Sequence, residues 1–248
     1  QRLAQLQQTD GGWGWWSENG SHSMISAYVM SGLGRANKLG YNVEKTIIEK
    51  GLAFLNQRIR QSGLLYGEKA YILYALALND RLEASLTDKV FDEEARLEAD
   101  PYTLSLLTLS LNHVGRKAEA KVSVKEIVKK AQMAGDDLVY WGNVGSYRWE
   151  LEAVETTAMA VRTLIVCDPQ NTLIKPALNW IMAQKGENGW NSTKDTSEVI
   201  LTLTTYLEQT KSLFDNKGTE VSVIFGRENK KVNVKNDVES VVFSKVSK

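Results

Sequence analysis

Few residues of this 248-residue sequence belong to types that carry out chemistry. The two histidines, His22 and His113, are far apart and have no partner at the spacing of a zinc site or of an activated nucleophile. The only cysteine, Cys167, ends a mostly apolar run, which indicates a buried packing residue and excludes an internal disulfide. We therefore expect no metal, no cofactor and no catalytic residue.

Acidic residues form two groups in which paired carboxylates could act as acid and base. Asp92 to Glu94 are typical of an outer helix start or a loop, where carboxylates suit exposed amides. Glu150, Glu152 and Glu155 are the only candidates for the carboxylate pair of a polysaccharide-processing enzyme. Glu155 opens a strongly apolar segment, so we expect capping hydrogen bonds from it at a helix start and count it as a candidate site residue.

The most distinctive motif is Asp-Gly-Gly-Trp-Gly-Trp-Trp, residues 10–16, which contains Trp13, Trp15 and Trp16. Glycine before an aromatic residue permits a tight turn that folds the indole back over helix ends. A second glycine-tryptophan loop surrounds Trp190. We expect Trp13 and Trp190 to join neighbouring helices at one rim. The other two tryptophans exceed that need, which indicates a rim that meets another domain.

Two further residues belong to this expected rim. His22 lies just before an apolar helix, beside the tryptophans, whereas His113 is expected at a helix C-terminus, where it suits the dipole. Tyr66 lies in a loop before a later apolar helix. The candidate rim or interface residues are therefore Trp13, Trp15, Trp16, His22, Tyr66, Glu155 and Trp190.

Charge and hydropathy exclude two classes of partner. Basic and acidic residues number 30 each and are interspersed, so no basic stripe exists that could release counterions from nucleic acid. No segment approaches the ~20 consecutive apolar residues that span a bilayer, so we expect no direct membrane insertion.

Apolar residues recur at helical spacing through most of the chain, with Gly, Asn and Asp at the breaks. The segment Arg81–Asp100 has a weaker pattern. The expected helices are Leu3–Gln8, Met24–Lys38, Val43–Arg60, Glu68–Asn79, Tyr102–Val114, Val122–Ala134, Glu152–Cys167, Leu173–Gln184 and Thr196–Thr210.

These helices are of two kinds that alternate. Residues 25–30, 70–76, 103–109 and 157–161 are apolar on nearly every side, so their helices must be buried on every side. The helices after Val43, Val122 and Leu173 have one apolar stripe and one charged face. Alternating inner and outer helices predict a mainly α fold, an (α/α) toroid of hairpins stacked around a common centre.

The pattern changes after Phe214. From Thr219 onward, apolar and polar residues alternate in two or three short stretches, which predicts strands. Two or three strands cannot cover their own faces and edges, and they therefore indicate part of a second domain. We assign residues 1–214 to the toroid, with its N-terminal helix or helices truncated, and residues 215–248 to this partial β segment.

Several segments, in this order, resemble the thioester domain shared by alpha-macroglobulins and complement proteins, especially the bacterial alpha-macroglobulins. They are residues 8–16 with 25–29, 100–104, 154–158 and 188–196, within about the first 210 residues. In that family the domain is an (α/α) toroid, like that of terpenoid cyclases, inserted in a small CUB-like β-domain. The resemblance therefore implies that residues 215–248 return to this β-domain.

Active family members carry a Cys-Gly-Glu-Gln motif whose side chains form a thioester, an acyl donor that captures nucleophiles. The motif is absent from this sequence and would belong upstream of Gln1. In some relatives a histidine directs the thioester toward hydroxyl groups, but the matching loop Leu65–Glu68 has no histidine.

The resemblance implies a non-catalytic domain of a protease-trapping protein, an endopeptidase inhibitor, that houses or shields an upstream thioester. Its partners would be neighbouring domains of the same protein and, through the whole protein, target proteases. Its location would be the periplasm, the cell envelope or the extracellular space. The alternative is an enzyme on the same toroid, such as a terpenoid cyclase, a prenyltransferase subunit or a polysaccharide-processing enzyme.

Overall fold

The computed structural model describes residues 2–16, 20–90, 93–143, 152–187, 189–214, 219–225 and 228–234. Its contacts divide the chain into two compact units, Gln1–Thr202 and Leu203–Lys248. None of the helices in these ranges is long and apolar enough to traverse a bilayer.

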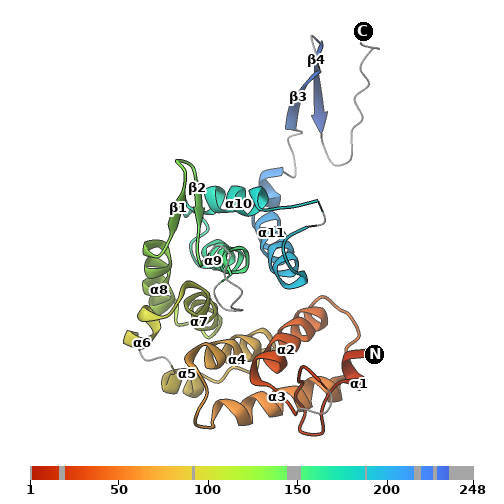
Figure 1. Cartoon of the computed structure of the whole chain (residues 1–248), viewed down its shortest axis with the longest axis vertical. Helices are drawn as coiled ribbons and strands as arrows, with labels where there is room; N and C mark the ends of the chain where they lie inside the picture. Colours follow the sequence, from red (N-terminus) through yellow and green to blue (C-terminus); the bar gives the residue numbers. More distant parts are fainter. Residues whose placement is uncertain are drawn as a thin grey trace. The chain divides into compact units, whose positions relative to one another are not determined.

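The first unit contains a set of inner helices, each packed against the next (Figure 1). Helix α2 contacts α4, α4 contacts α7, and α7 contacts α9. Helix α11 is tied to α9 by a hydrogen bond from Thr202 Oγ1 to the carbonyl of Ala158, 2.8 Å long. The hydroxyls of Tyr28 on α2 and Ser197 on α11 lie 3.4 Å apart, which closes the ring. The inner helices are α2 (Ser23–Lys38), α4 (Tyr66–Leu78), α7 (Pro101–His113), α9 (Ala153–Cys167) and α11 (Thr193–Phe214).

Outer helices alternate with these in the chain. Helix α3 (Lys45–Ile59) contacts α2 and α4, α8 (Lys117–Lys129) contacts α7 and α9, and α10 (Ile174–Ala183) contacts α9. Three shorter helices complete the unit: α1 (Arg2–Gln5), α5 (Ala84–Val90) and α6 (Glu93–Glu98). The predicted alternation of inner and outer helices around a common centre, and hence the (α/α) toroid, is confirmed.

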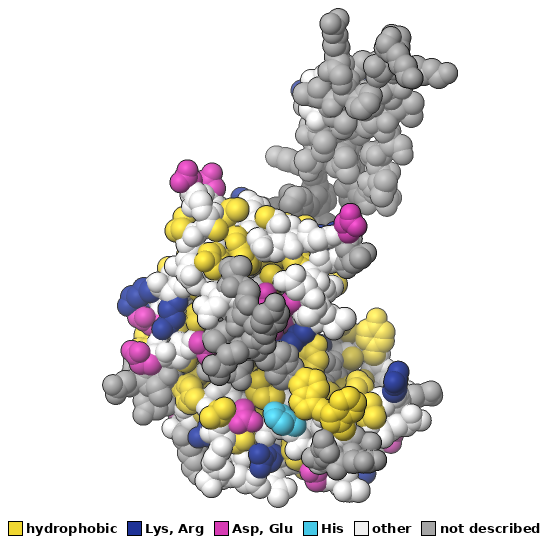
Figure 2. Space-filling model, in the orientation of Figure 1, with side chains coloured by type: hydrophobic (Ala, Val, Ile, Leu, Met, Phe, Trp, Pro, Cys, Tyr) yellow, Lys and Arg dark blue, Asp and Glu magenta, His cyan; other side chains and the backbone are white. Residues whose placement is uncertain are grey.

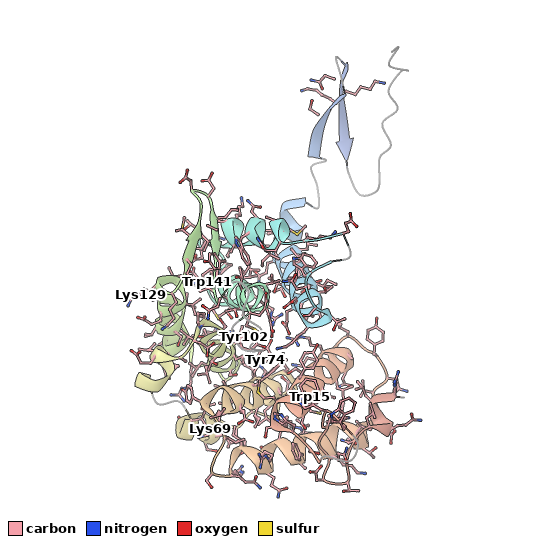
Figure 3. All side chains as sticks on the ribbon, in the orientation of Figure 1. Trp15, Lys69, Tyr74, Tyr102, Lys129 and Trp141 are labelled. Atoms are coloured by element: carbon pink, nitrogen blue, oxygen red, sulfur yellow. The ribbon has the colours of Figure 1, made fainter. Side chains whose placement is uncertain are left out.

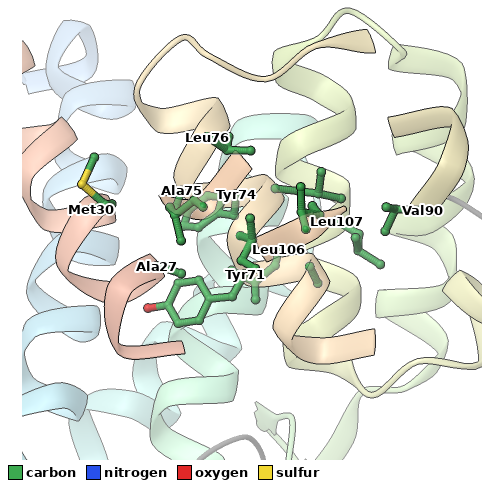
Figure 4. Close-up of a cluster of buried hydrophobic side chains, with 14 of the residues drawn as sticks. Ala27, Met30, Tyr71, Tyr74, Ala75, Leu76, Val90, Leu106 and Leu107 are labelled. Atoms are coloured by element: carbon green, nitrogen blue, oxygen red, sulfur yellow. The ribbon is translucent and has the colours of Figure 1, made fainter. Parts of the chain in front are cut away.

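Burial separates the two kinds of helix as expected. Every residue from Ala70 to Ala77 on α4 is buried, as are most residues of α7 and α9, and these side chains form the core (Figure 4). Helices α2 and α11 are exceptions, because Tyr28 and Val29 on α2 are only half-buried and Ile200 on α11 is exposed. The outer helices bury a single stripe, since their charged faces retain water.

The prediction of a helix to Ala134 is wrong at its C-terminal end. Helix α8 ends at Lys129, and Gln132–Ala134 form strand β1, paired antiparallel with β2 (Leu138–Tyr140). Gly135 adopts φ +70°, which permits the tight reversal between the strands. Val139 is buried and Tyr140 stacks on Trp180 at 5.0 Å between ring centroids, so the hairpin is anchored to α10.

The second unit begins within α11, and its described residues beyond that helix form one hairpin. Strands β3 (Thr219–Phe225) and β4 (Glu228–Val234) pair antiparallel. This agrees with the first two strands expected from the sequence. The third stretch of alternating residues, 238–243, lies outside the described residues.

Candidate functional site

A loop tryptophan joins two helices at the start of α2. The buried indole of Trp13 donates from Nε1 to the carbonyl of Leu3 at 2.8 Å. The Trp13 amide donates to Ser26 Oγ at 2.8 Å, and this hydroxyl donates to the Trp13 carbonyl at 3.1 Å. Gly11 has φ +91°, and a Cβ there would lie 2.5 Å from the carbonyl oxygen of Lys50. We call this two-way contact between a tryptophan backbone and a helix hydroxyl a hydroxyl bracket.

The same bracket recurs at the start of α9. The Trp141 amide donates to Thr157 Oγ1 at 2.9 Å, and that hydroxyl donates to the Trp141 carbonyl at 3.1 Å. The indole donates to the carbonyl of Ile127 on α8 at 2.6 Å. Trp141 is fully buried. The sequence analysis missed this tryptophan because its left-handed glycine, Gly142 with φ +90°, follows it instead of preceding it.

The loop before α11 contains a partial bracket. The indole of Trp190 donates to the carbonyl of Ile181 on α10 at 2.8 Å, and its amide lies 3.4 Å from Thr196 Oγ1. That hydroxyl donates to the carbonyl of Ser192 instead of Trp190. Gly189 has φ +114°. Three tryptophans therefore join an outer or terminal helix to the start of the following inner helix.

Two tryptophans of the first loop are exposed. Trp15 is 63% exposed and Trp16 71%, and Leu3 and Leu6 nearby in sequence are also exposed. Figure 2 shows hydrophobic side chains gathered on the face where Figure 3 labels Trp15. We call the exposed pair Trp15 and Trp16 the aromatic rim. Their exposure costs free energy in an isolated domain and is typical of a surface that is covered by a partner.

The two histidines have ordinary structural roles. His22 is exposed and is the N-cap of α2, with Nδ1 accepting from the amide of Met24 at 3.2 Å. His113 lies in the last turn of α7, as expected, with Nε2 3.4 Å from Asp80. Tyr66, in the first turn of α4, is half-buried.

Glu152, and not Glu155, caps α9. The Glu152 carboxylate accepts from the amides of Val154 and Glu155 at 2.8 and 3.1 Å. Burial, together with Asp195 nearby, raises the pKa of Glu152, although its backbone hydrogen bonds act in the opposite direction. The expected capping role of Glu155 is therefore wrong. Its companion Glu150 lies outside the described residues.

Glu155 forms a buried ion pair with α11. Its carboxylate lies 2.6 Å from Nζ of Lys194, and the two side chains are 3% and 11% exposed. The ammonium also lies 5.4 Å from the ring centroid of Tyr102 on α7. Burial raises the pKa of Glu155 to about 7, because the loss of hydration outweighs the attraction of Lys194.

A second buried pair connects the same helices. Nη2 of Arg162 on α9 lies 2.6 Å from the carboxylate of Glu198 on α11, and both side chains are about 95% buried. Burial alone would raise the pKa of Glu198, but the attraction of Arg162 and Arg35 outweighs it and lowers the pKa. Arg35 on α2 donates to the hydroxyl of Tyr74 at 2.5 Å. Figure 3 labels Tyr74 and Tyr102, which lie in the interior of the unit.

The described site residues join helices through tryptophan hydrogen bonds and buried ion pairs. Over the described ranges, no group of three or more His, Cys, Asp and Glu residues could hold a metal ion. Burial raises the pKa of the Cys167 thiol to about 11, so it is a poor nucleophile. Of the seven residues selected from the sequence, Trp13 and Trp190 lie in equivalent loops, whereas Glu155 belongs to the buried charge cluster. Sequence reasoning missed Lys194, Arg162 and Glu198, because the pairing of α9 with α11 leaves no local signal.

A family model and individual relatives agree on one family for this chain. Residues 70–206 match the family model of the A-macroglobulin TED domain. Alpha-2-macroglobulin of Thermotoga maritima is 28% identical over 202 residues, which cover 82% of this chain and 11% of that protein. Thioester-containing protein 1, allele S1, of Anopheles gambiae is 25% identical over 241 residues, 84% of this chain and 17% of that protein.

Solved structures show the same fold. Native alpha-2-macroglobulin of Escherichia coli, from domain MG7 to the C-terminus, gives a TM-score of 0.69 at 20% identity, covering 94% of this chain and 36% of that one. The trypsin-activated E. coli protein gives 0.64 at 20% identity, covering 94% of this chain and 16% of that one.

The fold and the tryptophan loops define an (α/α) toroid of the thioester-domain class. The chain belongs to the A-macroglobulin TED domain family. It spans between a tenth and a fifth of the length of the two relatives described above. These matches favour the alpha-macroglobulin interpretation over a cyclase, a prenyltransferase or a polysaccharide-processing enzyme.

Proposed function

We propose that this chain is a non-catalytic domain of a protease-trapping protein and that its aromatic rim packs against neighbouring domains of the same protein. The observation that carries the proposal is the family match together with the exposure of Trp15 and Trp16. Trp13 accounts for the joining of helices in that loop, whereas Trp15 and Trp16 expose most of their side-chain surface.

The relatives support the trapping role. The E. coli alpha-2-macroglobulin is described as activated by trypsin and by porcine elastase, and the Salmonella protein as reacted with methylamine, a small amine nucleophile. By analogy, proteolysis elsewhere in the whole protein would uncover the rim and release a thioester, if one lies upstream of Gln1. The partners would then be proteases, met outside the cytoplasm.

The C-terminal residues support the same assignment. The hairpin of β3 and β4 has two strands, and an isolated hairpin is at best marginally stable in water. We propose that residues 215–248 are part of a β-domain that the rest of the protein completes.

The test uses the whole protein that contains this chain. We expect it to retain an added protease after cleavage and to change its hydrodynamic radius or scattering profile on cleavage. If it retains no protease and keeps its shape after cleavage, the trapping role is wrong.

A double substitution tests the rim separately. Trp15→Ala with Trp16→Ala should give the activated shape without protease, because the covering interface loses its aromatic anchors. The matched control is Tyr41→Ala, an aromatic residue 69% exposed just beyond the opposite end of α2, which should leave the shape unchanged. Equal behaviour of the two variants would contradict the rim interface.

A further inference from the structure

The contact between α9 and α11 differs from the other inner contacts because it contains two buried ion pairs. The pairs are Glu155 with Lys194 and Arg162 with Glu198, both at 2.6 Å. The side chains around them are Tyr71 on α4, Tyr102 on α7 and Arg35 on α2. The charges thus lie where the last inner helix meets the ring.

The charges alternate in opposite order on the two helices. Along α9 the order is acidic then basic, Glu155 then Arg162, and along α11 it is basic then acidic, Lys194 then Glu198. Residue numbers rise together in the two pairs, but Ala158, between the two α9 residues, accepts from Thr202, beyond both α11 residues, so long side chains and not level backbone positions join the charges. The Arg162 side chain points toward the N-terminus of α9, so its Nη2 lies 3.0 Å from Sδ of Met159. In this position the same nitrogen reaches the carboxylate of Glu198.

Stability alone is a poor explanation for this arrangement. Nε and Nη1 of Arg162 have no hydrogen-bond partner among the described residues, although they are buried. Buried pairs that are incompletely satisfied are often no more stable than apolar residues of the same volume. Their best-attested use is to specify one register of packing.

We propose that the alternating charges of α9 and α11 fix the register in which α11 closes the ring. Moving α11 by one turn, about 5.4 Å, would bring Glu198 to the level of Lys194 and so toward Glu155. Moving it in the opposite direction would bring Lys194 toward Arg162. Both slips would separate an attractive pair and bring like charges nearer in a buried site, beyond the repulsion by which Glu198 already raises the pKa of Glu155. The native register is the one in which both pairs attract.

The inference can be tested by changing the order of the charges while keeping every pair opposite in sign. Arg162→Glu with Glu198→Arg makes α9 entirely acidic and α11 entirely basic at these positions, so slipped registers also attract. Reversing all four residues restores the alternation and is the matched control. Spin labels on cysteines at Val166 and Ile200, both exposed, report the register by their distance in a Cys167→Ala background of the full chain.

We expect one narrow distance distribution for the parent chain and for the four-residue reversal. The uniform-charge variant should add a second distance, shifted by several ångströms, since one turn is about 5.4 Å. A single unchanged distance in the uniform variant, or two distances in the four-residue reversal, would overturn the inference.

A second variant covers the case in which the uniform charges prevent folding. Arg162→Met with Glu198→Leu removes one pair and keeps the volume. We expect a melting temperature equal to or above that of the parent chain but a broadened label distance. A narrow distribution identical to the parent would show that the charges do not specify the register.

Discussion

The α4–α7 contact and the α9–α11 contact perform the same task with different physics. Between α4 and α7, Tyr71 and Leu106 are buried (Figure 4), and the Tyr71 ring meets that of buried Tyr102 edge to face at 6.3 Å between centroids. Between α9 and α11, buried charges lie at 2.6 Å from each other. Apolar packing is not directional and tolerates substitution, whereas ion pairs depend on a partner at one position. The difference indicates that apolar packing in the interior stabilises the fold, whereas the buried ion pairs specify how α11 packs against α9.

The largest expected effect comes from breaking the deeper ion pair. Arg162→Ala leaves Glu198 buried without its principal counterion and opens a cavity, so we expect a loss of about 3–5 kcal/mol. Urea unfolding followed by circular dichroism measures it. As a control, Arg60→Ala removes an exposed pair with Glu83 and should cost below about 1 kcal/mol. Similar losses for both variants would contradict the special role of the buried pair.

A substitution in the apolar contact should have the next largest effect. Leu106→Ala removes a side chain that is 1% exposed, and we expect a loss of about 3 kcal/mol from lost transfer free energy and the remaining cavity. The same urea titration applies. Leu106→Met conserves most of the volume and should cost less than about 1.5 kcal/mol. The comparison fails if the conservative variant is as unstable as the alanine variant.

The shallower ion pair should make stability depend on pH. The pKa of Glu155 is about 7 in the folded chain and near its ordinary value of 4.5 when unfolded, so the folded state holds the proton more tightly. Stability therefore rises as pH falls from 8 to 6, by about 1.4 kcal/mol for this group. Glu155→Gln should remove that increment, as the difference in unfolding free energy at the two pH values will show. An unchanged difference in the variant would contradict the assignment.

The smallest expected effect concerns a hydroxyl bracket. Ser26→Ala leaves the amide of buried Trp13 without the hydroxyl, whereas the Trp13 carbonyl still accepts from the His22 amide, so we expect a loss of about 1 kcal/mol. Ser85→Ala, at an exposed position of α5, is the control and should change stability by less than about 0.5 kcal/mol. Thermal unfolding measures both losses. Equal melting temperatures of the two variants would contradict a stabilising role of the bracket.

The spacing of apolar residues predicts most of the fold, because each helix sequence alone shows whether the helix is buried on one side or on every side. It placed α4, α7 and α9 within two residues of their ends. It failed after Lys129, where the β1–β2 hairpin is held by Tyr140 and Trp180, a contact between distant segments. It also failed for the buried charges. The position of Arg162 within an apolar run does not predict an ion pair, because its partner Glu198 lies on a different helix.

Helix α11 is continuous from Thr193 to Phe214, although the division between the two compact units falls at Thr202. Its 22 residues form a rod about 33 Å long without a proline or glycine joint. Both ion pairs lie within the first six residues of this helix, so whatever fixes their register also sets the place from which the chain continues beyond Thr202.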